Sequence, residues 1–195
     1  MKILLTGYKG KLGQELSKYL DIIPFEGDFT MPIIKQECDL VIHAGAYTKV
    51  QEAETEINAC FNANVYGTFN LVNVYQDIPF VYISTEYARN PLGVYALTKY
   101  LGEEVVKQHP QHLIIRTLFK PCPWPFDEAY EDQFTRGDYV DVIAQLIAEE
   151  VEKWDRQSKF MYIGTNRKTM LELAQRTKPD VIPNKITSSI IPHDY

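Results

Sequence analysis

Lys2-Ile-Leu-Leu-Thr-Gly7-Tyr-Lys-Gly10-Lys-Leu-Gly13, near the start of the 195-residue chain, decides the fold. Residues 2–6 predict a short buried strand, and the glycine-rich turn behind it is followed by leucines every fourth residue, which predict a helix: Leu12, Leu16 and Leu20. Glycines between a strand and a helix permit a tight turn and close approach of the backbone to a pyrophosphate, with the helix N-terminus behind it. Lys9 and Lys11 could add direct phosphate contacts. An ordinary glycine-rich connection is the alternative, but the order strand–turn–helix favours a dinucleotide site.

Strands and helices alternate after this turn. Apolar runs predict strands near 21–25, 39–43, 80–83 and 113–116, and helical periodicity predicts helices over about 52–75 and 94–108. The first of these helices carries one apolar face: Ile57, Phe61, Val65, Phe69 and Val72. Continuously apolar strands between helices are typical of a parallel sheet covered on both faces. We therefore predict a doubly wound, Rossmann-type α/β domain over residues 1–118.

The composition changes after Arg116. Residues 120–126, Lys-Pro-Cys-Pro-Trp-Pro-Phe, carry three prolines and cannot form regular structure. Beyond them we expect a helix over about 139–154, a strand near 159–163 and a short helix near 169–177. Residues 119–195 are interpreted as a small substrate or lid lobe that packs on the sheet and does not fold alone, with Trp124 or Phe126 near the substrate.

Composition excludes several classes of protein. With 45% hydrophobic residues the chain is globular, and a net charge of −6 gives no general attraction to nucleic acid or an anionic membrane. Three widely spaced cysteines without a CxxC pair predict neither a disulfide framework nor a zinc site, and a cytoplasmic setting is the simplest interpretation. No apolar run is long enough for a signal peptide or a membrane span. His109 and His112 flank a proline without a carboxylate partner, so no metal site is expected.

A second pattern concerns catalysis. Tyr95 and Lys99 are four residues apart on a predicted helix and share one face, whereas Leu97, Leu101 and Val105 are expected to pack inward on the other. A neighbouring ammonium lowers the pKa of a phenol, which can then exchange a proton with a carbonyl oxygen as a hydride is transferred. An ordinary amphipathic surface helix is the alternative. Thr85 ends the preceding predicted strand, where an open α/β sheet places its ligands, and its hydroxyl could bond the reacting carbonyl.

The ordered motifs together resemble the extended short-chain dehydrogenase/reductase superfamily, most closely its dTDP-4-dehydrorhamnose reductase-like branch. The similar segments lie in order over about residues 1–118: Thr6–Gly13, Gly27–Pro32, Asp39–Thr48, Asn64–Thr68, Ser84–Tyr87, Val94–Lys99 and Arg116-Thr117. A weaker similarity covers residues 138–144.

The resemblance implies a role for each matching position. Gly7, Gly10 and Leu12 would line the cofactor pyrophosphate, and Asp28 and Phe29 would meet its adenine end. Four residues would run beside the middle of the cofactor: Ala44, Gly45, Ala46 and Thr48. Thr85, Tyr95 and Lys99 would form the catalytic triad, with Tyr95 and Lys99 also at the cofactor and Lys99 on the nicotinamide ribose.

The chain also departs from the branch. Glu86 stands where members carry Asp, only nine residues separate Thr85 from Tyr95, and the chain is roughly a third shorter than its relatives. The resemblance implies an NAD(P)H-dependent reductase of a keto group on a nucleotide-activated sugar. The alternatives are a non-catalytic dinucleotide-binding regulatory subunit and an epimerase or dehydratase of the same superfamily. The choice between NAD and NADP stays open, because Glu26 or Asp28 could bind ribose hydroxyls while Lys9 or Lys11 could bind a 2′-phosphate. A homodimer is also left open.

Overall fold

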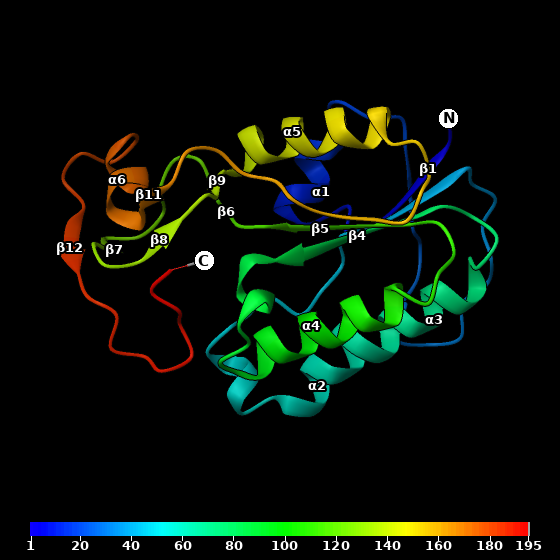
Figure 1. The fold of residues 1–195 in the computed structure, drawn as a ribbon, viewed down its shortest axis with the longest axis horizontal. Helices are drawn as coiled ribbons and strands as arrows, with labels where there is room; N and C mark the ends of the chain where they lie inside the picture. The colour runs from blue at the N-terminus through cyan, green and yellow to red at the C-terminus, as the bar shows by residue number, and fades with distance from the viewer. Residues whose placement is uncertain (195) are drawn as a thin grey trace.

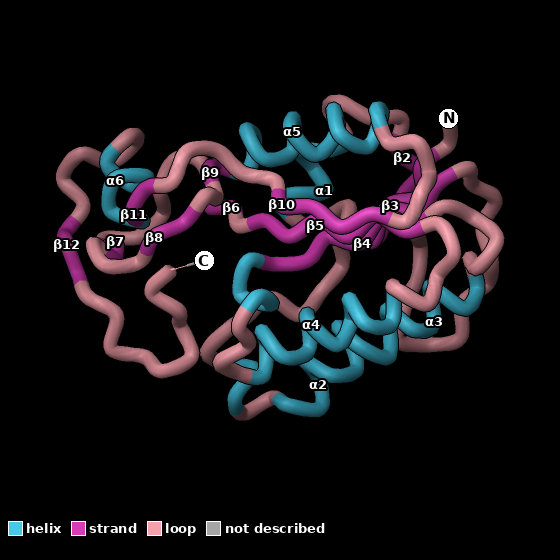
Figure 2. The backbone as a smooth tube through the Cα atoms, in the orientation of Figure 1, coloured by secondary structure: helices cyan, strands magenta, loops and turns pink. Residues whose placement is uncertain are grey.

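A six-stranded parallel sheet forms the centre of the protein in the computed structural model, which describes residues 1–194 (Figures 1 and 2). The strand order is β10-β5-β4-β3-β1-β2, with every neighbouring pair parallel. The strands span Ile3–Thr6 (β1), Ile22–Pro24 (β2), Leu40–His43 (β3), Phe80–Thr85 (β4), His112–Thr117 (β5) and Lys159–Tyr162 (β10). The predicted doubly wound α/β class is confirmed.

Helices cover both faces of this sheet. On one face, α1 (Lys11–Leu16) packs against α5 (Val140–Lys153), and on the other lie α2 (Ile57–Phe61), α3 (Gly67–Val74) and α4 (Val94–Val106) (Figure 1). Each face has its own buried apolar core, because β-strand side chains alternate between the two faces of a sheet. The carboxyl ends of the strands, with the loops that follow β1, β2, β3 and β4, therefore meet at one edge.

The predicted helix over 52–75 is interrupted. A short 3-10 turn at Glu52–Glu54 precedes α2, and a π-helical turn at Asn62–Tyr66 separates α2 from α3. The wider turn changes the helical phase, so that an apolar stripe with a constant period of 3.6 residues does not stay on one face. Asn64, inside this turn, is 1% exposed and uses its side chain for tertiary hydrogen bonds that are described below.

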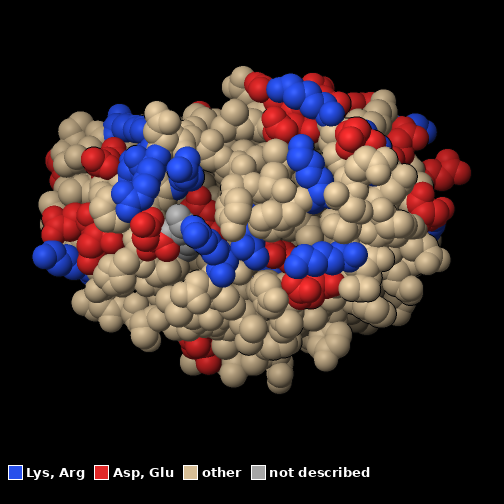
Figure 3. Space-filling model, in the orientation of Figure 1, with Lys and Arg blue, Asp and Glu red and all other residues tan. Residues whose placement is uncertain are grey.

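Parts of the apolar stripes of these helices are exposed to solvent, contrary to the prediction for α4. Ile57, Phe69 and Leu97 are 47%, 54% and 40% exposed, whereas Lys99 and Glu103 are buried against the sheet. A groove of about 580 Å³ runs between α3 and α4, lined in part by Val65, Phe69, Val72, Leu101 and Val105. The surface over α2 and α4 carries few charged side chains in Figure 3. Amphipathicity thus predicted the two faces of α4 correctly but their orientation wrongly, because the inward polar groups are paired inside the fold.

The C-terminal region begins at β6 (Phe119–Lys120) and contributes to two parts of the structure. The predicted helix and strand are present as α5 and β10, but both lie in the main sheet layers, so the lobe is smaller than the expected 119–195. The lobe consists of short strand pairs and α6 (Met170–Gln175): β6 with β9 (Asp138–Tyr139), β7 (Glu128–Tyr130) with β12 (Ile182–Asn184), and β8 (Phe134–Thr135) with β11 (Lys168–Thr169). It lies beyond the carboxyl end of β4 (Figure 1), and its core continues onto Tyr87 and Ala96.

Two absences concern the described part of the chain. None of the helices formed by residues 1–194 is long and apolar enough to cross a membrane. No group of three potential metal ligands among these residues is arranged to hold a metal ion.

Candidate functional site

The glycine-rich turn after β1 is shaped by close backbone packing at two of its three glycines. Gly7 has φ +71°, and a Cβ there would lie 2.7 Å from the backbone nitrogen of Gly45. A Cβ on Gly13 would lie 2.4 Å from the Gly7 carbonyl oxygen. At Gly10 the nearest atom would be that same oxygen, at 3.1 Å, and the residue is exposed. Gly7 and Gly13 therefore build the turn, while Gly10 leaves open backbone beside which a ligand can lie.

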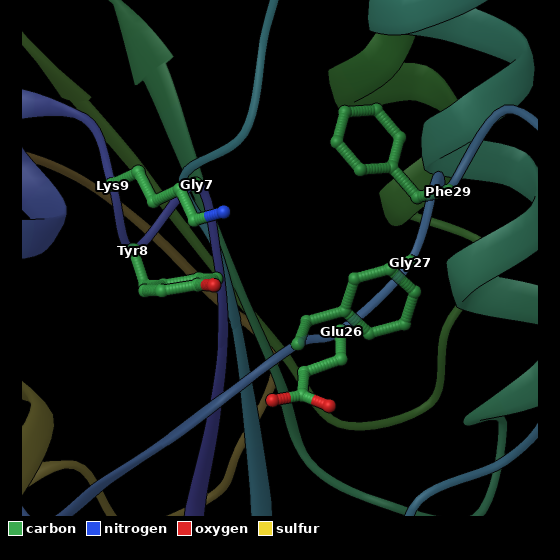
Figure 4. Close-up of a pocket in the computed structure, with 7 residues that line it drawn as sticks. Gly7, Tyr8, Lys9, Glu26, Gly27 and Phe29 are labelled. Atoms are coloured by element: carbon green, nitrogen blue, oxygen red, sulfur yellow. The ribbon is translucent and has the colours of Figure 1, made fainter.

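A cavity of about 470 Å³ opens beside this turn (Figure 4). It is lined by the loops that follow β1 and β2: Gly7, Tyr8, Lys9, Phe25, Glu26, Gly27 and Phe29. In Figure 4, Tyr8 and Lys9 lie on one side, Phe29 on the other, and Glu26 extends its carboxylate below them. The arrangement offers an ammonium, a carboxylate and aromatic faces at the carboxyl ends of two adjacent strands. It lies where the sequence predicts dinucleotide binding, and we call it the dinucleotide cavity after that prediction.

Phe29 is held in place by two further glycines. A Cβ on Gly45 would lie 2.7 Å from the Phe29 ring, and one on Gly67 would lie 2.4 Å from it. The ring also packs edge-on against His43 at 5.1 Å between centroids. The predicted segment Ala44–Ala46 thus contributes to the cavity indirectly, by seating the aromatic ring that lines it.

Other predicted cofactor residues lie outside this cavity. Asp28 is exposed, and its carboxylate accepts hydrogen bonds from the Thr30 backbone (2.8 Å) and hydroxyl (2.7 Å), which lower its pKa. Lys11 and Thr48 are exposed, and the Leu12 side chain is 5% exposed within the main core. Leu12 can therefore meet a pyrophosphate only through its backbone, and Asp28 is engaged in its own turn.

Asn64 connects the loop after β3 to helix α4. Its carboxamide oxygen accepts from the backbone N–H of Tyr47 (2.8 Å), and its amide group donates to the Tyr47 carbonyl (3.2 Å) and the Thr98 hydroxyl (3.0 Å). Asn64 was not among the predicted site residues, although an Asn in an apolar helical stretch is a signal for a buried hydrogen-bonding group. Asn64 fixes the predicted 44–48 loop relative to the helix that carries Tyr95 and Lys99.

Thr85 and Tyr95 come together at the carboxyl end of β4. Thr85 is 7% exposed, and its hydroxyl accepts a hydrogen bond from the Tyr87 N–H at 3.3 Å. Tyr95 lies in the first turn of α4 and is half-buried. Burial raises the pKa of Tyr95, and a side-chain hydrogen bond with Thr85 opposes that rise. In this structure the Tyr95 phenol is therefore held in its neutral form beside the Thr85 hydroxyl.

Lys99 lies one turn further along α4 but has a different set of partners. Its Nζ donates to the Ile83 carbonyl at 2.8 Å and lies 4.1 Å from the centre of the Tyr82 ring. Burial lowers the pKa of Lys99 to about 7, and the carboxylate of Glu103 opposes this shift. The expectation that Lys99 lowers the pKa of Tyr95 is wrong for this state, because the amine faces the β4 backbone and burial dominates at the phenol.

A buried ion pair holds α4 against the sheet. Glu103 is completely buried and accepts two hydrogen bonds from Arg116, at 2.7 and 2.6 Å, and one from the Ser84 hydroxyl. Arg116 lies across the Phe160 ring at 4.9 Å and donates to the Tyr162 hydroxyl at 3.0 Å. This pair fixes the register of α4 beside β4 and β5, and thereby the position of Tyr95 relative to Thr85.

Glu86 follows Thr85 directly and faces the lobe. Its side chain is 3% exposed and accepts a hydrogen bond from the Thr135 hydroxyl of β8 at 2.6 Å. Burial raises the pKa of its carboxyl group, and the Thr135 bond opposes the shift. The residue that departs from the family pattern therefore joins the carboxyl end of β4 to the lobe.

A second cavity, of about 350 Å³, lies between the lobe and the loop that follows β3. We call it the lobe cavity; its lining includes Val50, Tyr87, Lys120, Trp124, Phe126 and Tyr130. The Tyr87 ring stands edge-on to the Tyr95 ring, with 6.2 Å between centroids. The wall of the lobe cavity thus contacts the proposed proton donor through one aromatic ring.

The parallel sheet, the glycine-rich turn and the positions of Thr85, Tyr95 and Lys99 are features of the extended short-chain dehydrogenase/reductase superfamily. Residues 1–120 match the family described as the RmlD substrate binding domain, and the chain belongs to this family. It is 30% identical over 155 residues to the dTDP-4-dehydrorhamnose reductase of Escherichia coli K12, covering 60% of this chain and 50% of the relative. The corresponding enzyme of Salmonella typhimurium is 29% identical over 151 residues, covering 60% and 50%. The chain thus spans about half the length of the curated relatives it matches.

Solved structures share the fold over nearly the whole chain. A dTDP-4-dehydrorhamnose reductase from Bacillus anthracis in complex with NADP has a TM-score of 0.83 at 22% identity, covering 99% of this chain and 87% of that one. MoeE5 in complex with UDP-glucose and NAD has a TM-score of 0.82 at 15% identity, covering 100% and 88%. At these identities the likeness concerns the fold.

Proposed function

We propose that the protein is an NAD(P)H-dependent reductase of a keto group on a nucleotide-activated sugar. The observation that carries the proposal is the placement of Tyr95, in the first turn of α4, beside Thr85 at the end of β4, the edge of the sheet where the dinucleotide cavity also opens. Family membership and the reductases among its relatives support the same reaction class. The proposal therefore includes the class of substrate, a keto nucleotide-sugar, and the direction of the reaction, reduction.

The residues present fit a nicotinamide dinucleotide. Close backbone packing at Gly7 shapes the turn, Gly10 leaves open backbone, and Phe29 offers a ring face for a base. Gly7, Gly10 and the backbone of Leu12 would hold the pyrophosphate, with Lys9 as its counter-ion. The cofactor, when bound, supplies the hydride.

The chain's own residues carry the proton. Tyr95 would give its hydroxyl proton to the substrate oxygen on which negative charge develops, which requires a neutral phenol at the start of the reaction. Thr85 would hold that oxygen or the phenol in line through its hydroxyl. Lys99 would act on Tyr95 or on a ribose with the N–H groups that its bond to the Ile83 carbonyl leaves available. The Asn64 and Glu103 contacts would keep these three side chains in place.

The test is hydride transfer from NADH and NADPH to a panel of 4-keto nucleotide-sugars, followed by the nicotinamide absorbance. Turnover of at least one member by the wild-type protein, with dinucleotide binding measured separately, is the expected result. Binding of a dinucleotide without turnover of any panel member would replace the reductase with the second candidate, a dinucleotide-binding regulatory subunit. That candidate is favoured by one observation, the engagement of Lys99 with Ile83 instead of Tyr95.

An epimerase or dehydratase of the superfamily fits the site less well. The acid that follows Thr85 is Glu86, and its carboxylate is buried and hydrogen-bonded to Thr135. A group in that position does not present a proton to a substrate in the lobe cavity. The homodimer stays a prediction, and sedimentation velocity of the wild-type protein tests it.

A further inference from the structure

Lys120 is an ammonium without a counter-ion in the wall of the lobe cavity. It ends β6 and is half-buried, and within residues 1–194 its Nζ has no hydrogen bond or ion pair. Its nearest polarisable groups are the rings of Trp124 and Phe126, at 5.9 and 5.8 Å from Nζ to the ring centres. These distances are near the outer limit of a cation–π contact, so the rings compensate only part of the lost hydration.

No acid of the cavity neutralises this lysine. Glu128 is the carboxylate in the lining, and it is bonded to the Asn184 side chain at 2.5 Å. Burial accordingly lowers the pKa of Lys120, with no opposing acid. A cation in this position has a free-energy deficit that an anion entering the cavity would remove.

Of the two rings beside Lys120, that of Trp124 is held rigidly. Trp124 is 6% exposed, its backbone N–H donates to the Thr177 hydroxyl (2.9 Å) and its indole N–H donates to the Glu128 carbonyl (3.3 Å). Phe126 is 50% exposed and stands edge-on to Trp124, with 5.5 Å between ring centres. The cavity therefore presents a fixed aromatic wall next to its cation, and that combination suits a ligand with both an anionic and an apolar or planar part.

We propose that Lys120 determines specificity in the lobe cavity by binding an oxyanion of the substrate, a diphosphate or a sugar carboxylate, beside the Trp124 and Phe126 rings. The inference rests on the proposed function, since it takes the lobe cavity as the substrate site. It adds that a substrate without an anionic group at this position is rejected, because its binding would bury Lys120 without a partner.

The experiment compares ligand pairs that differ by one anionic group. Dissociation constants are measured by calorimetry for dTDP against thymidine, and for UDP-glucuronic acid against UDP-glucose, with the wild type, Lys120→Met and Lys120→Arg. Met keeps the length of the apolar stem and removes the charge, whereas Arg keeps the charge. Lys185→Met is the matched control, because Lys185 is an exposed lysine of the same lobe outside the cavity.

If Lys120 binds a diphosphate, Lys120→Met should lower the affinity for dTDP by about tenfold to a hundredfold. This is the loss expected when one hydrogen bond between two charged groups is removed. Thymidine binding would not change, both UDP-sugars would weaken equally, and Lys120→Arg would retain most of the affinity. For a carboxylate, only UDP-glucuronic acid would weaken. Repeating the series in Gly10→Val keeps dTDP out of the dinucleotide cavity and assigns the effect to the lobe cavity.

Two results would overturn the inference. One is unchanged affinity of Lys120→Met for all four ligands, or no binding of any of them by the wild type. The other is equal weakening of dTDP and thymidine, which would make Lys120 a packing residue. Lys120-dependent dTDP binding in a protein that transfers no hydride would support the inference and refute the reductase. A kcat/KM for the nucleotide-sugar that is the same in Lys120→Met and the wild type would support the reductase and refute the inference.

Discussion

The dinucleotide cavity and the lobe cavity lie in the same molecule but are built in different ways. The first is formed by two loops within residues 7–29, and its shape depends on backbone packing at Gly7, Gly13 and Gly45. The second collects side chains from positions as distant as Val50, Trp124 and Ile191. A site made by local backbone can be recognised in a sequence, whereas a site made by side chains from distant segments requires the fold.

The two cavities also differ in charge. Lys9 and Glu26 line the dinucleotide cavity together, so its lining contains one ammonium and one carboxylate. In the lobe cavity the ammonium of Lys120 has no acidic partner, because Glu128 is bonded elsewhere. Under the proposed function, the first cavity would hold the cofactor between opposite charges, while the second would receive an anion.

The largest expected effect tests whether the two cavities serve one reaction. Tyr95→Phe should retain the fold, dinucleotide binding and dTDP binding but lower kcat by about 10²–10⁴-fold, because the ring stays and the proton donor is lost. The measurement is hydride transfer at saturating cofactor, beside both binding constants. Tyr100→Phe, on the same helix, is the control and should change none of them. Equal turnover of Tyr95→Phe and wild type would show that another group donates the proton.

A second substitution should disable the dinucleotide cavity alone. Gly10→Val places its side chain over the open backbone of the turn and should weaken NADH and NADPH binding by about a hundredfold or more, through loss of charge-assisted contacts to the pyrophosphate. Its melting temperature should stay near that of the wild type, because a Cβ at Gly10 meets only one atom at 3.1 Å.

Gly13→Val provides the contrast, since its Cβ would overlap the Gly7 carbonyl oxygen at 2.4 Å and should lower the melting temperature. dTDP binding to the lobe cavity should persist in Gly10→Val. Unchanged cofactor affinity in a folded Gly10→Val protein would remove the turn from the cofactor site.

Lys99 belongs to the lining of neither cavity, and its charge state can be tested through stability. Its folded pKa of about 7 is lower than the unfolded value of about 10.4, so the unfolded chain binds more protons between these values. The stability of the wild type should therefore rise with pH through this window, and the cost of the buried ammonium should be fully present below pH 7.

Lys99→Met removes that cost. Its gain in unfolding free energy over the wild type should be largest at pH 6 and decline towards pH 10, by at most roughly 1.4 kcal/mol for each pH unit between the folded and unfolded pKa values. Urea unfolding at pH 6, 8 and 10 measures the difference, with the exposed Lys107→Met as control. Parallel pH profiles for Lys99→Met and wild type would show that Lys99 is solvated in solution.

The sheet and the dinucleotide turn could be predicted because their signals are local. Continuous apolar runs at β1, β3 and β4 and the glycines between β1 and α1 need no knowledge of distant partners. The orientation of α4 could not be predicted in this way. Periodicity separates Leu97 and Leu101 from Lys99 and Glu103, but Lys99 and Glu103 can face inward only because Ile83 and Arg116, distant in sequence, supply partners.

The same reason explains the residues that the sequence analysis left without a role. Asn64 acts through Tyr47 and Thr98, and Glu86 acts through Thr135. These hydrogen bonds form only once segments that are distant in the sequence have come together in the fold. Lys120 was part of a segment recognised as irregular, but its lack of an acidic partner is a property of the folded cavity. The resemblance to a known family supplied Thr85, Tyr95 and Lys99, while the structure shows that the Lys99 amine donates to the Ile83 carbonyl.

The smallest expected effect concerns cofactor choice in the dinucleotide cavity. Glu26 follows β2, where a carboxylate can bond ribose hydroxyls and repel a 2′-phosphate, and it lines the cavity opposite Lys9. Glu26→Gln removes the charge without changing the size of the side chain, and should strengthen NADPH binding relative to NADH by about tenfold or less, because the exposed group is screened by solvent. The ratio of the two dissociation constants, measured by fluorescence titration at two salt concentrations, checks this. Glu15→Gln, on helix α1 outside the cavity, is the control. An unchanged ratio would place the adenosine ribose away from Glu26 and leave Lys9 as the residue to examine for the 2′-phosphate.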